Sequence, residues 1–229
     1  MDLCLSLIQK GARINCEEEE WGYTPLIQAI AGHHFAIAEW LMNHGADVNV
    51  KTRNGDTPIK DLCIRNGDDP WDGRKVAEMV IEKLNDKESR LSEILTKESY
   101  NREICEWLIS KGADVDAVDN HLNTPLIKAS RNGDRQIAEL LISKDAKIDH
   151  RNEDGQNALI FASERGHKEI VELLLNNGAN IKAKDNKGKT AMNYAREKGF
   201  IEIEEILKSK RVSLISKLSR HFGATRIPG

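Results

Sequence analysis

A short motif recurs along this chain of 229 residues at a nearly fixed distance, and no other feature limits the possible folds as strongly. Thr-Pro followed by Leu or Ile begins at Thr24, Thr57 and Thr124, and softened versions of the motif begin at Asn157 and Thr190. The successive distances are 33, 67, 33 and 33 residues, so one interval is a doubled period. A period of this length predicts a stack of small repeats, each packed only on its neighbours.

A second motif keeps the same phase. Gly-Ala, followed by a polar or basic residue and then Ile or Val, begins at Gly11, Gly45, Gly112 and Gly178. At Asp145 the same element occurs with its glycine lost. Two independent motifs that share one phase make the repeat a strong prediction.

The residues of a single unit predict a turn and two helices. Proline suits the first turn of a helix, and the threonine before it can cap that helix. In the unit that begins at Asn157, a short first helix covers 159–163, and apolar residues at helical spacing over 170–175 form the second. Gly178 ends the second helix, and a turn at 185–188 leads into the next unit.

A 33-residue unit of this kind resembles the ankyrin repeat. The segment 154–180 matches the family pattern along its full length, and the resemblance is clear at 16–62 and 101–207. It implies an all-α fold, an ankyrin-repeat solenoid of stacked helix-turn-helix units with short β-turn fingers. It also implies a non-enzymatic role in protein–protein interaction.

We expect one repeat domain over 1–210 and a basic C-terminal helix or tail over 211–229. The predicted units are a half-repeat at 1–15 and repeats at about 16–50, 51–84, 85–116, 117–149, 150–182 and 183–210. The doubled period has two explanations: a degenerate repeat at 85–116, or one repeat with a long insertion between its helices. We favour the degenerate repeat because the phase is almost kept, with a short insertion at 68–73. The half-repeat would also arise if a longer parent protein was cut here.

The resemblance implies that partners contact the finger tips and first helices, which line a concave face. The candidate partner-binding residues are Trp21, Tyr23, Gln28, Arg53, Asn54, Asp56, Trp71, His121, Asn123, Lys128, Arg131, Gln156, Phe161, Glu164, Lys187, Lys189 and Tyr194. Trp21 and Tyr194 are the leading aromatic anchors, because aromatic side chains are typical of interface centres. Tyr23 and Phe161 are also explained by packing between units. Trp71 lies in a proline-containing loop that either contacts a partner or packs back on the stack.

One departure from the family concerns the histidine that usually follows Thr-Pro-Leu. Its place is taken by Ile27, Lys60, Ile127, Ile160 and Asn193. In the family this histidine ties adjacent fingers by hydrogen bonds. Its loss predicts weaker coupling between units and local unfolding in the weakest part, 63–100.

No pattern of a catalytic, cofactor or metal site is found. The pair His33-His34, together with His44, suggests a metal site, but nothing supplies a further ligand at useful spacing. The four cysteines form no Cys-x-x-Cys pair, which favours reduced thiols in or near the core. Phosphate-binding glycine loops and nucleophile elbows are absent. We therefore expect no enzyme activity, no cofactor and no metal.

Charge separates the chain into two parts. The net charge of −3 gives no footprint for nucleic acid, yet residues 208–229 contain six basic and no acidic residues. An apolar stripe in this tail consists of Leu214, Ile215, Leu218 and Phe222. The tail is either a helix that caps the stack or a basic amphipathic helix that docks to an anionic membrane. Near the other end, Glu17–Glu20 forms an acidic rim that could steer a basic partner toward Trp21.

The function that we expect is binding of one protein partner by a monomeric chain. Two alternatives remain open: an adaptor or microbial effector that docks through its basic tail, and the recruiting part of a larger enzyme. The absence of a long apolar run and of a secretory leader favours an intracellular, cytoplasmic location. The heavy use of Lys, Asn and Ile indicates an AT-rich genome, and delivery into a host cell is a further alternative.

Overall fold

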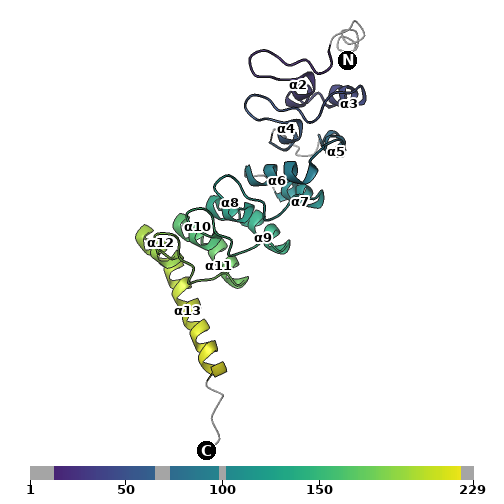
Figure 1. Ribbon diagram of the computed structural model, residues 1–229. Coiled ribbons are helices and arrows are strands. Elements are labelled where there is room, and N and C mark those ends of the chain that lie inside the picture. Colours follow the sequence, from purple (N-terminus) through teal and green to yellow (C-terminus); the bar gives the residue numbers. More distant parts are fainter. Residues whose placement is uncertain (1–12, 65–72, 98–101, 223–229) are drawn as a thin grey trace, which may run out of the picture. The chain divides into compact units, whose positions relative to one another are not determined.

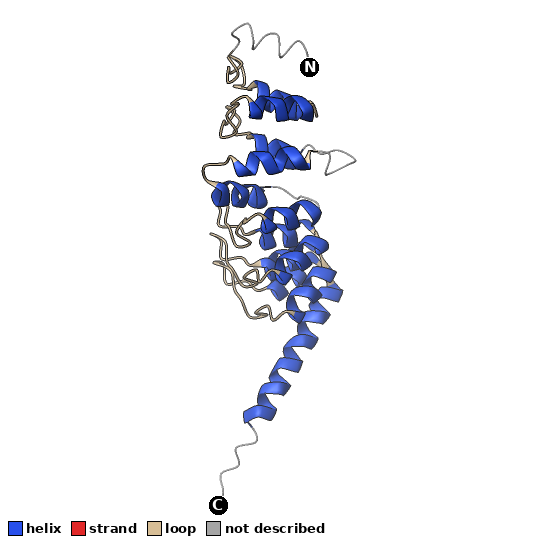
Figure 2. Ribbon diagram, turned by 90° about the vertical axis from the view of Figure 1, so that its right-hand side faces the viewer, coloured by secondary structure: helices blue, strands red, loops and turns tan. Residues whose placement is uncertain are grey.

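The computed structural model describes residues 13–64, 73–97 and 102–222. Within these ranges the regular structure is helical and no strand occurs (Figure 2), so the predicted all-α class is confirmed. The chain divides into two compact units, residues 1–90 and 91–229, which are described separately below.

The described part of unit 1 contains two helix pairs. They are α2 (Pro25–Ala31) with α3 (Phe35–Asn43), and α4 (Pro58–Ile64) with α5 (Arg74–Glu82). The first helices, α2 and α4, pack on each other, and so do the second helices, α3 and α5 (Figure 1). The repeat predicted from 33-residue spacing is therefore a stacked pair of hairpins.

Unit 2 continues the same arrangement with more members. Its helices are α6 (Lys87–Lys97), which begins just before the boundary of the unit, α7 (Arg102–Ser110), α8 (Pro125–Asn132), α9 (Arg135–Ser143), α10 (Ala158–Arg165), α11 (Lys168–Asn176), α12 (Ala191–Lys198) and α13 (Ile201–Phe222). The first helices α8, α10 and α12 pack side by side (Figure 1), and the second helices α7, α9, α11 and α13 form a parallel row. The connecting fingers of this unit gather on one side of the helices (Figure 2).

Each first helix begins where the sequence motif predicts. The side-chain oxygens of Thr24, Thr124 and Asn157 accept a hydrogen bond from the N–H three residues later, at 3.4, 3.3 and 3.0 Å. Thr57 and Thr190 make the same contact. Asparagine at 157 is thus a functional replacement for threonine, because its amide oxygen caps the helix equally well.

The isoleucines that replace the family histidine lie in the core. Ile27, Ile127 and Ile160 are at most 1% exposed. The fingers are nevertheless connected by backbone hydrogen bonds from Arg53 to Trp21 (3.1 Å), Glu153 to His121 (3.1 Å) and Asn186 to Asp154 (2.9 Å). The substitution therefore exchanges a polar contact for apolar packing and leaves a backbone link between fingers.

A second link between repeats is a ladder of side-chain acceptors at the end of the Gly-Ala motif. In each case an Asn or Asp accepts the backbone N–H of the following repeat. The pairs are Asn15 with Asp47 (2.8 Å), Asn49 with Asn85 (3.1 Å), Asp116 with Lys147 (2.8 Å) and Asp149 with Asn180 (2.9 Å). At Asp114 the acceptor is the Ser92 hydroxyl (2.8 Å). The polar end of the motif is therefore structural.

The region of the doubled period contains helices on both sides of the predicted insertion. Most of that insertion, together with Trp71, lies outside the described residues. The pair α6 and α7 fits a degenerate repeat at 85–116, and the repeat boundaries remain a prediction. At the C-terminal end, α13 runs without a break through residue 210, so the predicted boundary between repeat and tail does not coincide with a helix end.

The ladder can be tested at Asp149. Its carboxylate accepts from the N–H of Asn180 and from the Asn157 amide, so Asp149→Ala leaves both donors without this partner. We expect the free energy of unfolding of unit 2 to fall by about 1 kcal/mol, a typical net value for such contacts. Urea denaturation followed by circular dichroism measures the change. Glu172→Ala removes an exposed carboxylate from α11 and should leave the midpoint unchanged; an equal shift in both variants would contradict the role of the ladder.

Candidate partner-binding face

In unit 1 the predicted contact residues centre on an exposed tryptophan. Trp21 is 44% exposed and sits on a turn that the Glu18 carboxylate holds in place. This carboxylate accepts from the backbone N–H groups of Glu20 and Trp21, each at 3.2 Å. Gly22 follows with φ of +74°, a conformation that glycine adopts without strain. The backbone that carries the indole is therefore fixed before any partner binds.

Arg53 connects this turn to the next finger. Its backbone N–H donates to the carbonyl of Trp21, and its guanidinium donates to the carbonyl of Glu20 (3.2 Å). Of the other predicted residues in unit 1, Gln28 and Asn54 are exposed and Tyr23 is half-buried. Asp56 is paired with Lys60 at 2.6 Å. The predicted residues of unit 1 whose side chains are accessible to a partner are therefore Trp21, Gln28, Arg53 and Asn54.

In unit 2, Lys128 is a tie within the fold. Its side chain is only 15% exposed. The ammonium pairs with Asp119 at 2.9 Å and donates to the carbonyl of Thr96 near the end of α6. The contact couples a finger to a neighbouring first helix, which leaves little of the charge for a partner.

The same lysine sets the ionisation of Asp119. Burial raises the pKa of this carboxyl, but hydrogen bonds from Lys128, from the Asn123 backbone and side chain and from the His121 backbone outweigh it. The result is a pKa of about 2, below the ordinary 3.8. Asn152 and Asp185 occupy the same position in the next two fingers, and each accepts two N–H groups of its own turn.

Three predicted contact residues are buried. Phe161, Tyr194 and Asn123 are 7%, 7% and 5% exposed. The Tyr194 hydroxyl donates to Asp185 at 2.6 Å, and burial together with this bond raises the tyrosine pKa to about 12. Phe161 and Tyr194 lie on first helices that are packed against neighbouring first helices. Asn123 lies in a finger, where its side chain donates to Asp119 and accepts from the Asn152 amide. The expectation of Tyr194 as a leading surface anchor does not fit this burial, and packing is the better interpretation.

The remaining predicted residues of unit 2 differ in exposure and in whether an ionic partner occupies the side chain. His121 contacts the Glu153 carboxylate at 2.6 Å, and Lys189 is paired with Glu197 at 2.7 Å. Lys187 is exposed, and Arg131, Gln156 and Glu164 are half-buried. Their contact with a partner remains a prediction.

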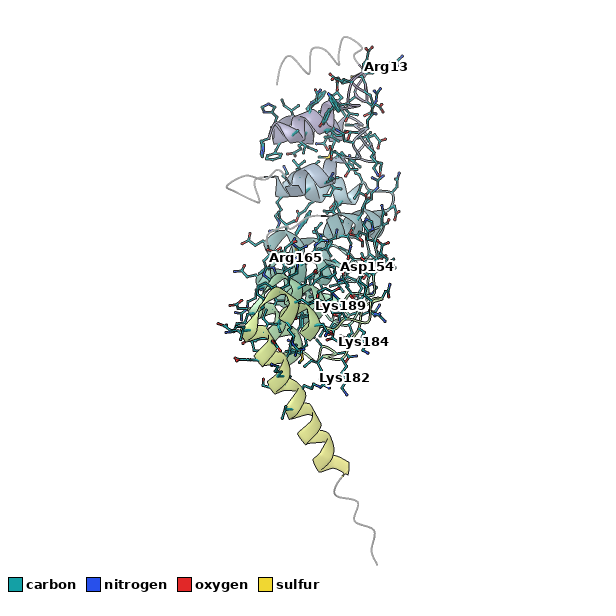
Figure 3. All side chains as sticks on the ribbon, turned by 90° about the vertical axis from the view of Figure 1, so that its left-hand side faces the viewer. Arg13, Asp154, Arg165, Lys182, Lys184 and Lys189 are labelled. Atoms are coloured by element: carbon teal, nitrogen blue, oxygen red, sulfur yellow. The ribbon has the colours of Figure 1, made fainter. Side chains whose placement is uncertain are left out.

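Four exposed residues of the fingers were missed by sequence reasoning. They are Val118, Leu122, Lys182 and Lys184. Figure 3 shows Lys182, Lys184 and Lys189 along the same side of unit 2 as Asp154. The repeat phase contains a signal for one of them, because Leu122 stands where the other fingers have glycine.

The cysteines correct one expectation. Cys105 is buried, as predicted, and burial raises its pKa to about 12. Cys16, however, is exposed in the first finger and does not belong to the core. Cys4 and the side chain of Cys63 lie outside the described part of the chain. Across the described ranges, no cluster of three His, Cys, Asp or Glu side chains is placed to hold a metal ion. Within the same residues, no helix is long and apolar enough to cross a membrane.

Comparison with known proteins agrees with this architecture. Models of ankyrin repeats match residues 7–60, 92–152 and 145–217. Because these matches cover most of the chain, it belongs to the ankyrin-repeat family, whose members generally mediate protein–protein interaction.

Individual relatives share only part of their length with this chain. The human 2-5A-dependent ribonuclease is 42% identical over 59 residues, which is 26% of this chain and 8% of the ribonuclease. The rat ankyrin repeat and SAM domain-containing protein 6 is 30% identical over 86 residues, 38% of this chain and 10% of the relative. A Caenorhabditis elegans relative, ankyrin repeat and KH domain-containing protein mask-1, is 34% identical over 76 residues, 28% of this chain and 3% of the relative. This chain thus matches a tenth or less of each relative's length, and the likeness to the ribonuclease lies in its ankyrin repeats.

The low pKa of Asp119 predicts how acid affects unit 2. Because the folded pKa (about 2) is below the ordinary value (3.8), the ionised carboxylate stabilises the fold above about pH 4. This contribution is lost as the pH falls through 2. We expect Asp119→Asn to lower stability at neutral pH and to weaken the decline between pH 4 and 2. Urea unfolding midpoints measured between pH 4 and 2 test this prediction. Asp154→Asn is the control, because it also removes one negative charge, from an exposed position. A decline as steep as in the wild type would contradict the assignment.

Proposed function

We propose that this chain is a non-enzymatic interaction module that binds a protein partner through its fingers and first helices. The observation that carries the proposal is Trp21, a large aromatic side chain left exposed on a turn whose backbone is already held by Glu18 and Arg53. Large aromatic side chains contribute much of the binding energy at interface centres, and a fixed backbone lowers the entropy lost on binding.

The surface around Trp21 supplies polar contacts of the kind that surround such an anchor. Gln28, Arg53 and Asn54 are exposed in unit 1. The acidic residues Glu17–Glu20 precede the tryptophan, and their charge would speed the approach of a basic partner. Within unit 2, His121 and Lys187 keep exposed side chains and are the corresponding candidates for partner contact. We place this activity in the cytoplasm, either of the cell of origin or of a host cell.

Two other roles remain as alternatives to this proposal. The likeness to a 2-5A-dependent ribonuclease supports a role in which such repeats recruit substrates for a catalytic domain elsewhere in a longer protein. The basic end of the chain supports docking to an anionic membrane. Val212 is 66% exposed in α13, and the tail beyond it is basic. Flotation of the chain with anionic liposomes, with and without residues 212–229, separates the membrane role from the protein-binding role.

Replacement of the anchor tests the proposal. We expect Trp21→Ala combined with Arg53→Ala to reduce capture of a specific partner from lysate at least about tenfold, as loss of an interface centre does. The measurement is an affinity capture quantified by mass spectrometry after circular dichroism has shown equal folding.

The matched control is Trp40→Ala, which removes the half-buried tryptophan of α3 that stacks on His44 at 3.9 Å. Capture should survive this change, because α3 is a second helix outside the proposed face. Partners that are retained by the Trp21 and Arg53 variant would place the site elsewhere and contradict the proposal.

A further inference from the structure

Leu122 adopts a backbone conformation that its side chain disfavours. Its φ is +60°, and the equivalent positions of the other described fingers are Gly22, Gly55, Gly155 and Gly188, all with positive φ. Glycine adopts this conformation freely, whereas a side chain of leucine's size is strained in it. One finger of unit 2 thus has a leucine where the repeat requires glycine.

Among the described residues, two other non-glycine residues have positive φ, and they are less unusual. They are His33 (+57°) and Asp145 (+63°), each at a position where other repeats have glycine. Aspartate and histidine are found in this conformation several times more often than other residues. Leu122 is the apolar member of the three, and 46% of it is exposed.

The hydrogen bonds of Leu122 involve its backbone alone. The backbone N–H of Leu122 donates to the carbonyl of Asp119 at 2.9 Å, and its carbonyl contacts His150 Nε2 at 3.1 Å. Any residue except proline can supply those two backbone groups. Val118, four residues earlier in the same finger, is 44% exposed and adds to the apolar surface. A strained residue that shows its apolar side chain to solvent is a candidate for binding.

Hydrogen bonds join this finger to the next two. The Glu153 N–H donates to the carbonyl of His121, and the Asn186 side chain donates to the carbonyl of Glu153 (2.8 Å). The guanidinium of Arg151 donates to the carbonyl of Lys184 (2.7 Å). The tips of the three fingers at 118–122, 150–154 and 182–187 therefore form one continuous surface within unit 2.

The last of these fingers is basic. Lys182, Lys184 and Lys187 are exposed, and within the described residues none of the three ammonium groups has an ion-pair partner. The acidic residue between them, Asp185, is buried and hydrogen-bonded to Tyr194. Two exposed carboxylates on the middle finger oppose them, Asp154 (Figure 3) and Glu153, which contacts His121, while Arg151 on the same finger adds a further exposed positive charge. The balance of free charge on the surface is positive.

We propose that these three finger tips are a docking surface for an extended acidic segment of a protein partner. An apolar side chain of that segment contacts Leu122 and Val118, and its carboxylates contact Lys182, Lys184 and Lys187. The inference rests on the proposed function and narrows it to a surface in unit 2 and a partner chemistry. A single nucleic-acid strand fits less well, because such strands stack on aromatic side chains and the described part of these fingers exposes no Phe, Tyr or Trp.

The test uses random 16-residue peptides displayed on phage and selected on the full chain. We expect the selected sequences to be enriched in Asp and Glu around one aliphatic or aromatic residue. Synthetic versions, labelled with fluorescein, would then be titrated by fluorescence polarisation. Binding should weaken at 0.5 M salt, because exposed charges are screened over about 10 Å already at 0.1 M.

Two variants localise the binding. Leu122→Gly should weaken it at least about fivefold while the unfolding midpoint stays equal or rises, since the strain is relieved. Asp145→Gly is the matched control, which makes the same backbone change at another loop and should keep full affinity. The variant with Lys182, Lys184 and Lys187 changed to Gln should bind the peptides at least about tenfold more weakly. Changing Lys51, Lys144 and Lys198 to Gln alters the net charge equally and should leave the affinity unchanged.

Several results would overturn the inference. They are the selection of no acidic consensus, equal affinity of Leu122→Gly and wild type, and a fall in the midpoint of Leu122→Gly, which would make the leucine structural. Tighter binding of a labelled 16-nucleotide single strand than of the peptides would assign the surface to nucleic acid. If capture still depends on Trp21 while no acidic peptide binds, the proposed function stands and this inference fails. If capture does not depend on Trp21 and no acidic peptide binds, the proposed function and this inference both fail.

Discussion

Hydrogen bonds from one repeat to the backbone of the next are the constraint on which the rest of each unit depends. A helix pair of this size cannot bury its apolar face alone, so every repeat needs a neighbour held at a set distance. The acceptors at Asn15, Asn49, Asp116 and Asp149 provide that spacing at 2.8 to 3.1 Å. The apolar layers, with Ile27, Ile127 and Ile160 almost fully buried, then close between the hairpins. The polar end of each Gly-Ala motif is therefore as much a part of the fold as its apolar side chains.

Hydrogen bonds within the fingers likewise explain why few of their side chains remain available to a partner. Asp119, Asn152 and Asp185 are each used to close their own turn. Lys128 and Tyr194 complete these turns from the first helices. What is left outside is a small set of side chains whose backbone is fixed and whose own groups are not needed by the fold. Trp21 in unit 1 and Leu122 and Val118 in unit 2 are the apolar members of that set for which a binding role is proposed.

Much of the fold could be predicted from the sequence, and much less of the site. Threonine at 24 and 124 and asparagine at 157 indicated helix starts that the structure confirms, because capping is a local interaction between residues three apart. Phe161 and Lys128 were selected from their place in the repeat, yet the first is buried and the second is tied to Asp119. Periodicity identifies the face of a repeat that points toward the fingers, but exposure depends on what the adjacent repeat places against it. Leu122 could have been found by comparing glycine positions between repeats.

By itself, the sequence determined the repeat period, the all-α class, the helix starts and the place of the glycine turns. These are set by contacts within about four residues or by spacing that recurs along the chain. Only the tertiary structure decided which side chains in those places are exposed. Tyr194 and Trp21 look equally suited to binding in the sequence, but Tyr194 donates its hydroxyl to a buried aspartate and Trp21 stands 44% exposed. The difference arises because burial is a property of the stacked neighbours, which are about 33 residues away along the chain, and not of the residue itself.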